Sequence, residues 1–329
     1  MSDFVNVTLD DIRRPVSDEL ALFEQYFSQA IEVSDPYVKG ILSIIFRKRG
    51  KQLRPLLTLL SAALHSKPTH RSLVAATLIE LVHTASLVHD DVIDEAYHRR
   101  GEFSANALFR GKKSILIGDF ILARMMKIMA SEAGPELLSA TSRVIEQLCE
   151  GELLQMEHVE MLNNDRESYE RIIRYKTGVL LGLCSEAGAI SVGANPEICE
   201  NMRLFGEQLG IAFQIKDDLL DYSKTEITGK FTCNDIIEQK ITLPMIYLLN
   251  NCDSGERRRA LRLLSRVRRE PENAQILRQM VEESGGLDYA TKCMTEIKDK
   301  AISLIAPYPQ SPIKDALIGF SEFILSRDK

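Results

Sequence analysis

The pattern Asp-Asp-x-x-Asp occurs twice in this chain, each time at the end of a long apolar stretch with helical periodicity. Residues four apart share one face of a helix, so each copy gathers its carboxylates on one side. Carboxylates that surround a common space repel one another unless cations neutralise them. The sequence therefore predicts two helices that form opposite walls of one cation site. The two copies are Asp90, Asp91 and Asp94, and Asp217, Asp218 and Asp221.

The type of ligand narrows the choice of cation. All candidate ligands are carboxylate oxygens, and no Cys pair or His pair accompanies them. Hard oxygen ligands suit Mg²⁺ or Mn²⁺ rather than Zn²⁺, and Mg²⁺ binds one or two protein carboxylates together with substrate phosphates. We therefore expect two or three Mg²⁺ ions, for which Mn²⁺ can substitute, to bridge the protein and a polyphosphate.

Composition favours an all-α protein. Apolar residues make up 45% of the 329 positions, helix formers dominate, and period-2 alternation is scarce. We find neither a linker nor an internal repeat, so residues 1–329 are expected to form a single domain. The net charge of −6 gives no electrostatic reason to expect nucleic acid as a partner.

The chain shows no sign of export or membrane insertion. Its six cysteines are scattered singly, the first residues lack an apolar signal region, and no uncharged stretch approaches membrane-spanning length. We expect a cytoplasmic protein without a transmembrane segment.

Basic and polar residues elsewhere are candidates for binding phosphate. Lys51 and Arg54 lie in a basic turn at residues 47–55 and could hold a diphosphate, although such a run is often only a solvated loop. His83 lies two helical turns before Asp90, on nearly the same face. Lys176 precedes Thr177 and Gly178 inside an apolar helix, where they weaken the helix and free backbone groups. The alternative is an exposed lysine beside a packing glycine.

A second interpretation of the first cluster is a metal phosphohydrolase built on the pair His89-Asp90. That architecture needs further His and Asp ligands from other helices. The chain has six histidines, and most lie outside plausible ligand spacing.

Taken in order, several motifs resemble the trans-isoprenyl (polyprenyl) diphosphate synthase family. They are GKQLRP, HDDVID followed by RRG, YKT, FQIKDDLLD, and GK followed by DIIEQKITLP, and they extend over nearly the whole chain. The ending ALIGFSEFILSRDK is also similar to bacterial octaprenyl diphosphate synthases. The resemblance implies a helical bundle of the isoprenoid-synthase type around a deep central cavity, Mg²⁺ dependence and a homodimer.

The resemblance also implies roles for individual residues. Both aspartate clusters would bind Mg²⁺, with Asp90, Asp94, Arg99, Lys176 and Asp217 in catalysis. Isopentenyl diphosphate would be held by Gly50, Lys51, Arg54, His83 and Arg100. The allylic diphosphate would contact Arg99, Lys176, Thr177, Gln214, Lys230 and Lys240.

Side chains near the first cluster bear on product length. Ala85 and Ser86 are small where a bulky aromatic would close the tunnel of short-chain relatives. Met125, Met126 and Met129 are candidates for the tunnel floor. We therefore expect farnesyl diphosphate to be extended to about C40, as a precursor of quinone side chains, with peripheral membrane contact during product release.

Several alternatives remain open at this point. They are a C15 or C20 synthase, a non-catalytic partner subunit of a heteromeric synthase, a class I terpene cyclase and a purely structural helical protein. The chain also departs from the family at Cys233 and Gln239, where relatives usually have glycine. Side chains there affect how the loop that carries Lys230 and Lys240 closes.

Overall fold

The computed structural model describes residues 8–47, 50–94, 98–99, 102–223 and 233–326. Two predicted site residues, Arg100 and Lys230, lie outside these ranges. The described chain is helical apart from one antiparallel pair of two-residue strands, β1 (His98–Arg99) and β2 (Glu102–Phe103). The prediction of an all-α fold is therefore confirmed.

Contacts within the chain define two compact units. Unit 1 comprises Met1–Ile145, Leu183–Arg203 and Tyr308–Phe320, and unit 2 comprises Glu146–Gly182, Leu204–Pro307 and Ser321–Lys329. We describe each unit by itself, and the single domain expected from the sequence stays a prediction.

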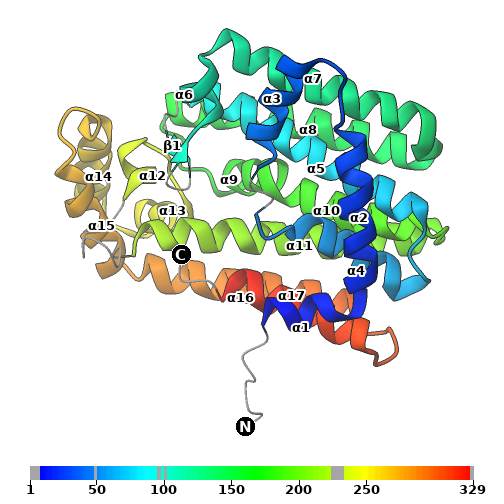
Figure 1. The fold of residues 1–329 in the computed structure, drawn as a ribbon. Helices are drawn as coiled ribbons and strands as arrows, with labels where there is room; N and C mark the ends of the chain where they lie inside the picture. Colours follow the sequence, from blue (N-terminus) through cyan, green and yellow to red (C-terminus); the bar gives the residue numbers. More distant parts are fainter. Residues whose placement is uncertain (1–7, 48–49, 95–97, 100–101, 224–232, 327–329) are drawn as a thin grey trace. The chain divides into compact units, whose positions relative to one another are not determined.

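In unit 1 the central element is α5 (His70–Ile93), which packs against α2, α4 and α7 (Figure 1). Side chains all around α5 are buried, among them Val74, Leu78 and Ile79. A helix that is apolar on every side belongs in a core. By length and mean hydropathy α5 could also cross a membrane, but 61% of its most apolar window is buried inside the protein. We therefore assign it as a core helix.

Unit 1 contains several other elements, of which α6 and η2 also contact α5. They are α1 (Leu9–Arg13), η1 (Arg14–Val16), α2 (Ser17–Ala30), α3 (Pro36–Ile45), α4 (Leu53–His65), α6 (Ala105–Phe109), α7 (Lys112–Ile128) and the π-helical η2 (Met129–Ala133). Unit 1 also contains parts of α8 (Gly134–Glu160), α10 (Val179–Ser191), α11 (Pro196–Asp221) and α17 (Pro312–Leu325).

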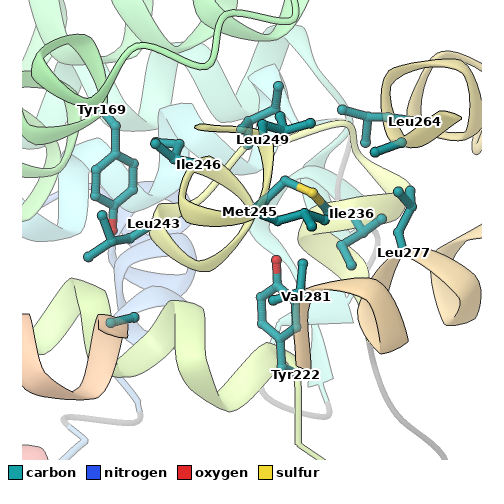
Figure 2. Close-up of a cluster of buried hydrophobic side chains, with 14 of the residues drawn as sticks. Tyr169, Tyr222, Ile236, Leu243, Met245, Ile246, Leu249, Leu264, Leu277 and Val281 are labelled. Atoms are coloured by element: carbon teal, nitrogen blue, oxygen red, sulfur yellow. The ribbon is translucent and has the colours of Figure 1, made fainter. Parts of the chain in front are cut away.

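Unit 2 is built around α13 (Leu243–Asn251), which packs against α14 (Ser254–Arg266), α15 (Asn273–Glu283) and α16 (Gly286–Ile305). Figure 2 shows Met245 and Leu249 of α13 among the side chains of this core, which Tyr169 and Tyr222 also join. The remaining elements are α9 (Arg166–Ile173), the π-helical η3 (Arg174–Gly178), α12 (Asn234–Ile237), and parts of α8, α10, α11 and α17.

Candidate active site

The second aspartate cluster lies on the last turns of α11. The side chain of Asp218 is buried, and both of its oxygens accept hydrogen bonds. Tyr169 donates its hydroxyl proton to Oδ2 at 2.6 Å, and Gln214 donates from Nε2 to Oδ1 at 3.1 Å. Burial, together with the charges of Asp217 and Asp221, raises the pKa of Asp218 to about 6, although the two hydrogen bonds oppose the rise. A nearby cation would stabilise the ionised form.

Asp221, unlike Asp218, accepts its hydrogen bonds from backbone N–H groups. Its Oδ1 accepts the backbone N–H of Asn234 and its Oδ2 accepts that of Asp235, both at 2.9 Å. These two bonds tie the end of α11 to the first turn of α12. The third aspartate of the pattern therefore positions the segment that leads to Lys240, in addition to any ligand role.

Lys176 and Thr177 lie in η3, where the sequence predicted a weakened helix. At Gly178, η3 lies very close to α11. A Cβ added to Gly210 of α11 would lie 2.6 Å from the Cα of Gly178. Thr177 donates its hydroxyl proton to Oε1 of Gln214 at 2.8 Å. Gln214 thus links Thr177 to Asp218.

The Lys176 ammonium is held by two residues of α8. Its Nζ lies 3.0 Å from Oε1 of Glu152 and donates to Oε1 of Gln155 at 2.9 Å. The structure combines parts of the two interpretations that the sequence left open. Lys176 lines a cavity, as the phosphate-binding interpretation predicts, and Gly178 is a packing glycine, as the alternative predicts.

The cavity that Lys176 lines lies entirely within unit 2 and has a volume of about 100 Å³. A single water molecule needs about 10–15 Å³ on this measure, so the cavity has room for several waters or for a phosphate group. Its polar lining includes His158, Lys176, Gln214, Asp218, Asp235 and Lys240.

Two of these lining residues affect how much charge the cavity carries, because a carboxyl group with a pKa above 7 is mostly uncharged at neutral pH. Burial and the charges of Asp218 and Asp221 raise the pKa of Asp235 to about 8, and Lys240 opposes the rise. The Nζ of Lys240 also lies 2.5 Å from Oε2 of Glu238. The cavity therefore combines ammonium groups with carboxylates, as a site for a metal-bound phosphate requires.

Cys233 and Gln239, the two departures from family glycines, have left-handed backbone with φ of 49° and 65°. Glycine adopts this conformation without steric cost, whereas other residues adopt it rarely. Here the side chains make contacts of their own. Gln275 donates from Nε2 to Sγ of Cys233 at 3.7 Å, and Gln239 donates to the carbonyl of Leu264 at 3.0 Å.

The first aspartate cluster ends α5 in unit 1. Asp91 is buried and accepts the backbone N–H of Ala105 at 3.1 Å, which fixes the start of α6. Asp90 is half-buried, and the exposed Asp94 ends the helix through a hydrogen bond from its N–H to the carbonyl of Asp90 at 2.8 Å. Asp90 and Asp94 are therefore more accessible to a ligand than Asp91.

His89 faces α7. Its Nε2 lies 3.2 Å from the carbonyl oxygen of Ile115 and 3.4 Å from Oδ1 of Asp119. A Cβ on Gly118 would lie 2.2 Å from this ring nitrogen, so α7 needs glycine there. His89 is thus engaged in helix packing, and the described residues give no support to a His-Asp phosphohydrolase centre.

The residues predicted to hold isopentenyl diphosphate come from α4, α5 and the turn before α4. Arg13 donates to the backbone carbonyl of Lys51 at 2.7 Å, and the Lys51 side chain is exposed. Gly50 has a φ of 53°. Burial raises the pKa of Glu80, while the positive charge of Arg54 opposes the rise. The carbonyl of His83 accepts a hydrogen bond from Ser86 at 3.0 Å. The backbone of Arg99 lies in β1.

The predicted chain-length residues do not all lie in an interior. Ala85, Met125 and Met129 are buried, and Ser86 is half-buried. Met126 is 60% exposed, because successive residues on a helix point about 100° apart. The place of Met126 in a tunnel floor stays a prediction, which this exposure does not favour.

The donor set fits a hard divalent cation. Within the described ranges, no three His, Cys, Asp or Glu side chains converge into a ready-made cage. Mg²⁺ does not need one, because it completes its shell with waters and phosphate oxygens. Asp90, Asp94 and Asp217 offer accessible carboxylates, and buried Asp218 gains most from a neighbouring positive charge.

Sequence reasoning missed several polar residues of the unit 2 cavity. No motif marked Tyr169, Glu152, Gln155 or His158. Asp235 could have been found, because it lies within the quoted segment DIIEQK between two predicted phosphate ligands.

An all-α fold with two Asp-Asp-x-x-Asp helices and a cavity lined by lysine and carboxylate is that of a prenyltransferase. The family model of the polyprenyl synthetases matches residues 35–284, and the chain belongs to this family.

Individual relatives agree with this assignment. The chain is 34% identical to the all-trans-nonaprenyl-diphosphate synthase (geranyl-diphosphate specific) of Rhodobacter capsulatus, covering 96% of this chain and 97% of that protein. It is also 34% identical to the octaprenyl diphosphate synthase of Escherichia coli, over 85% and 87% of the two chains. The crystal structure of a polyprenyl synthase from Caulobacter crescentus, complexed with calcium and isoprenyl diphosphate, matches with a TM-score of 0.88 and 30% identity over 99% of both chains.

Proposed function

We propose that this protein is a long-chain trans-polyprenyl diphosphate synthase that adds isopentenyl diphosphate units head to tail to farnesyl diphosphate. The product is about C40, octaprenyl diphosphate, and supplies quinone side chains. The observation that carries the proposal is the linked set Thr177–Gln214–Asp218–Tyr169 beside Lys176. It presents an ammonium group and an oriented carboxylate to a cavity of about 100 Å³ within a chain of the polyprenyl synthetase family.

The described residues suit the two diphosphates. In unit 2, Lys176, Thr177, Gln214 and Lys240 bind the allylic diphosphate. The same role for Arg99 and Lys230, whose side chains lie outside the described part of the chain, rests on the family resemblance. In unit 1, Gly50, Lys51, Arg54, His83 and Arg100 bind isopentenyl diphosphate. Arginine forks and lysine point charges are the usual protein ligands of phosphate.

Asp90, Asp91, Asp94, Asp217, Asp218 and Asp221 are the candidate holders of Mg²⁺. When bound, Mg²⁺ supplies a Lewis acid that stabilises negative charge on the leaving diphosphate. Lys176 adds a fixed positive charge, because Glu152 and Gln155 hold its ammonium group in place. Tyr169 and Gln214 keep the Asp218 carboxylate in one orientation before substrate arrives.

The allylic cation that forms on ionisation must meet the double bond of isopentenyl diphosphate before water does. An apolar, water-poor wall provides this protection. The departing diphosphate accepts the proton that the adduct loses.

Product length is set along α5, α7 and η2. Ala85 and Ser86 leave room for the growing chain, and the buried Met125 and Met129 block it further on. Replacing either methionine with alanine lengthens the product, and an unchanged product distribution would remove both residues from this role.

The protein acts as a homodimer through an apolar face on α7 and α8. Ile115, Leu116 and Met126 of α7 and Leu138 of α8 are each more than 40% exposed. Ile115, Leu116 and Met126 lie along one helix, and exposed apolar side chains that gather on one surface can mark a protein–protein interface. The exposed Met126, unsuited to an interior wall, fits this role.

The protein works in the cytoplasm and contacts the membrane at its periphery when the product is released. All six cysteines are free, as expected in a reducing compartment.

The test is incubation of the purified protein with farnesyl diphosphate, labelled isopentenyl diphosphate and Mg²⁺, with and without EDTA, followed by chain-length analysis. Products near C40 that disappear with EDTA support the proposal. Products that stop at C15 or C20 retain the chemistry and reject the chain-length argument. Failure to elongate any allylic primer identifies a non-catalytic partner subunit instead.

A further inference from the structure

One surface of unit 2 is strongly basic although the chain as a whole is acidic. Residues 254–270, which comprise α14 and the turn after it, contain seven arginines and two glutamates, a net charge of +5, whereas the whole chain carries −6. All seven arginines are exposed. We call this set the α14 arginine surface: Arg257, Arg258, Arg259, Arg262, Arg266, Arg268 and Arg269.

Few of these arginines form hydrogen bonds or ion pairs with other described residues. Arg257 donates to Oδ1 of Asn164 at 3.3 Å, and Arg268 donates to the carbonyl of Glu238 at 3.1 Å. The positive charge of Arg258 helps to lower the pKa of Asp253, which precedes α14, whereas Arg259, Arg262, Arg266 and Arg269 form no ion pair with a carboxylate of the described residues. Structural pairing therefore does not account for them.

Other exposed helices of unit 2 arrange their charges differently. On α15 Arg278 lies 3.0 Å from Glu282, and on α16 Lys292 lies 3.9 Å from Glu296, each pair four residues apart. On α14 the positions four apart are Arg258, Arg262 and Arg266, so like charges face one another. Such an arrangement destabilises a helix, whereas alternating charges stabilise it. An anionic partner outside the helix would offset the repulsion among the arginines of the α14 arginine surface.

The opposite face of α14 packs into the core of unit 2. Ala260 and Leu264 are buried in the core of unit 2, and the helix lies beside α15 (Figure 1). The helix therefore cannot insert an apolar face into a bilayer. Any binding must come from the guanidinium groups, which favour phosphate because of their planar, bidentate donors.

We propose that the α14 arginine surface binds the phosphate headgroups of an anionic membrane and holds the enzyme at the surface that receives its product. This identification of the partner rests on the proposed function, because a long polyprenyl chain with a charged head partitions into a bilayer. The excess of negative charge outside residues 254–270 disfavours a nucleic acid that would wrap the protein.

The test is sedimentation of the purified protein with phosphatidylcholine vesicles that either contain or lack phosphatidylglycerol. We expect binding only to the anionic vesicles, and loss of binding as salt rises from about 0.1 M to about 0.5 M, since screening shortens the reach of surface charge. Each arginine at an anionic surface contributes about fivefold in affinity, so the triple variant R258Q/R259Q/R262Q should bind about a hundredfold more weakly.

The matched control is K67Q/K292Q/K300Q, which removes the same charge from three other exposed positions. It should bind as the wild type does. Equal weakening of both variants, absence of wild-type binding, or binding to single-stranded RNA in place of anionic vesicles would each overturn the proposal. Elongation of farnesyl diphosphate without vesicles tests the proposed function separately, and both variants should retain it.

Discussion

The close approach of η3 to α11 makes Gly210 the most constrained position near the unit 2 cavity. A Cβ on Gly210 would lie 2.6 Å from the Cα of Gly178 and 3.0 Å from the carbonyl oxygen of Thr177. Both contacts are with backbone, which cannot swing away as a side chain can. Carbon atoms prefer a separation of about 3.5–4.0 Å, so Gly210→Ala must move the two elements apart by about 1 Å.

This displacement should affect both stability and activity. Overpacking of this kind costs about 1–3 kcal/mol of unfolding free energy, to be measured by urea denaturation. It also disturbs the 2.8 Å hydrogen bond from Thr177 to Gln214 and the neighbouring Lys176. A misplacement of about 1 Å can lower catalysis about a hundredfold, so kcat/KM for farnesyl diphosphate elongation should fall on that scale.

The control for this prediction is Gly40→Ala, on α3. An added Cβ there meets nothing within 4 Å, so helix propensity alone should raise the unfolding free energy by about 0.5–1 kcal/mol. Elongation should be unchanged. If Gly210→Ala matched Gly40→Ala in both stability and rate, the close helix approach would have no role in the site.

Three further substitutions test separate parts of the account. Asp221→Ala should lower the unfolding free energy by about 1–2 kcal/mol through loss of both N–H acceptors at α12, and Asp221→Asn should lose less; equal losses would contradict the capping role. Burial lowers the pKa of His65 below its usual 6.5, so the unfolded chain binds the proton more readily and stability should fall as pH drops through 6.5. Urea denaturation across this range should show a shallower fall in His65→Gln, and an identical slope would exclude His65 as a cause. Leu116→Glu should convert the dimer to monomer in sedimentation velocity, whereas Leu22→Glu, at a comparably exposed position on α2, should not; a dimeric Leu116→Glu protein would place the interface elsewhere.

Local sequence signals predicted much of the fold. The scarcity of alternating strands indicated an all-α chain, and Lys176-Thr177-Gly178 marked the segment that forms the π-helical η3. Cys233 and Gln239 were singled out as departures from glycine, and both have positive φ. These features depend on neighbours in sequence, which explains why they could be predicted.

Contacts between distant segments could not be predicted in the same way. The hydrogen bond from Tyr169 to Asp218 joins residues 49 apart, and no periodicity encodes it. Asp221 fitted the metal pattern by spacing, yet both of its oxygens bind backbone N–H groups 13 and 14 residues later. Met126 shares a methionine-rich stretch with Met125, but the helical rotation between them exposes one and buries the other.

The central claim is that both aspartate clusters serve one metal-dependent prenyl transfer. The most direct test is the elongation rate of Asp90→Asn and Asp217→Asn with farnesyl diphosphate, labelled isopentenyl diphosphate and Mg²⁺. Each variant removes a charge from an accessible carboxylate with little change in shape. We predict that each folds as the wild type by circular dichroism and loses at least about a thousandfold in kcat. Full activity in either variant would contradict the claim, because the affected cluster would then not serve the reaction.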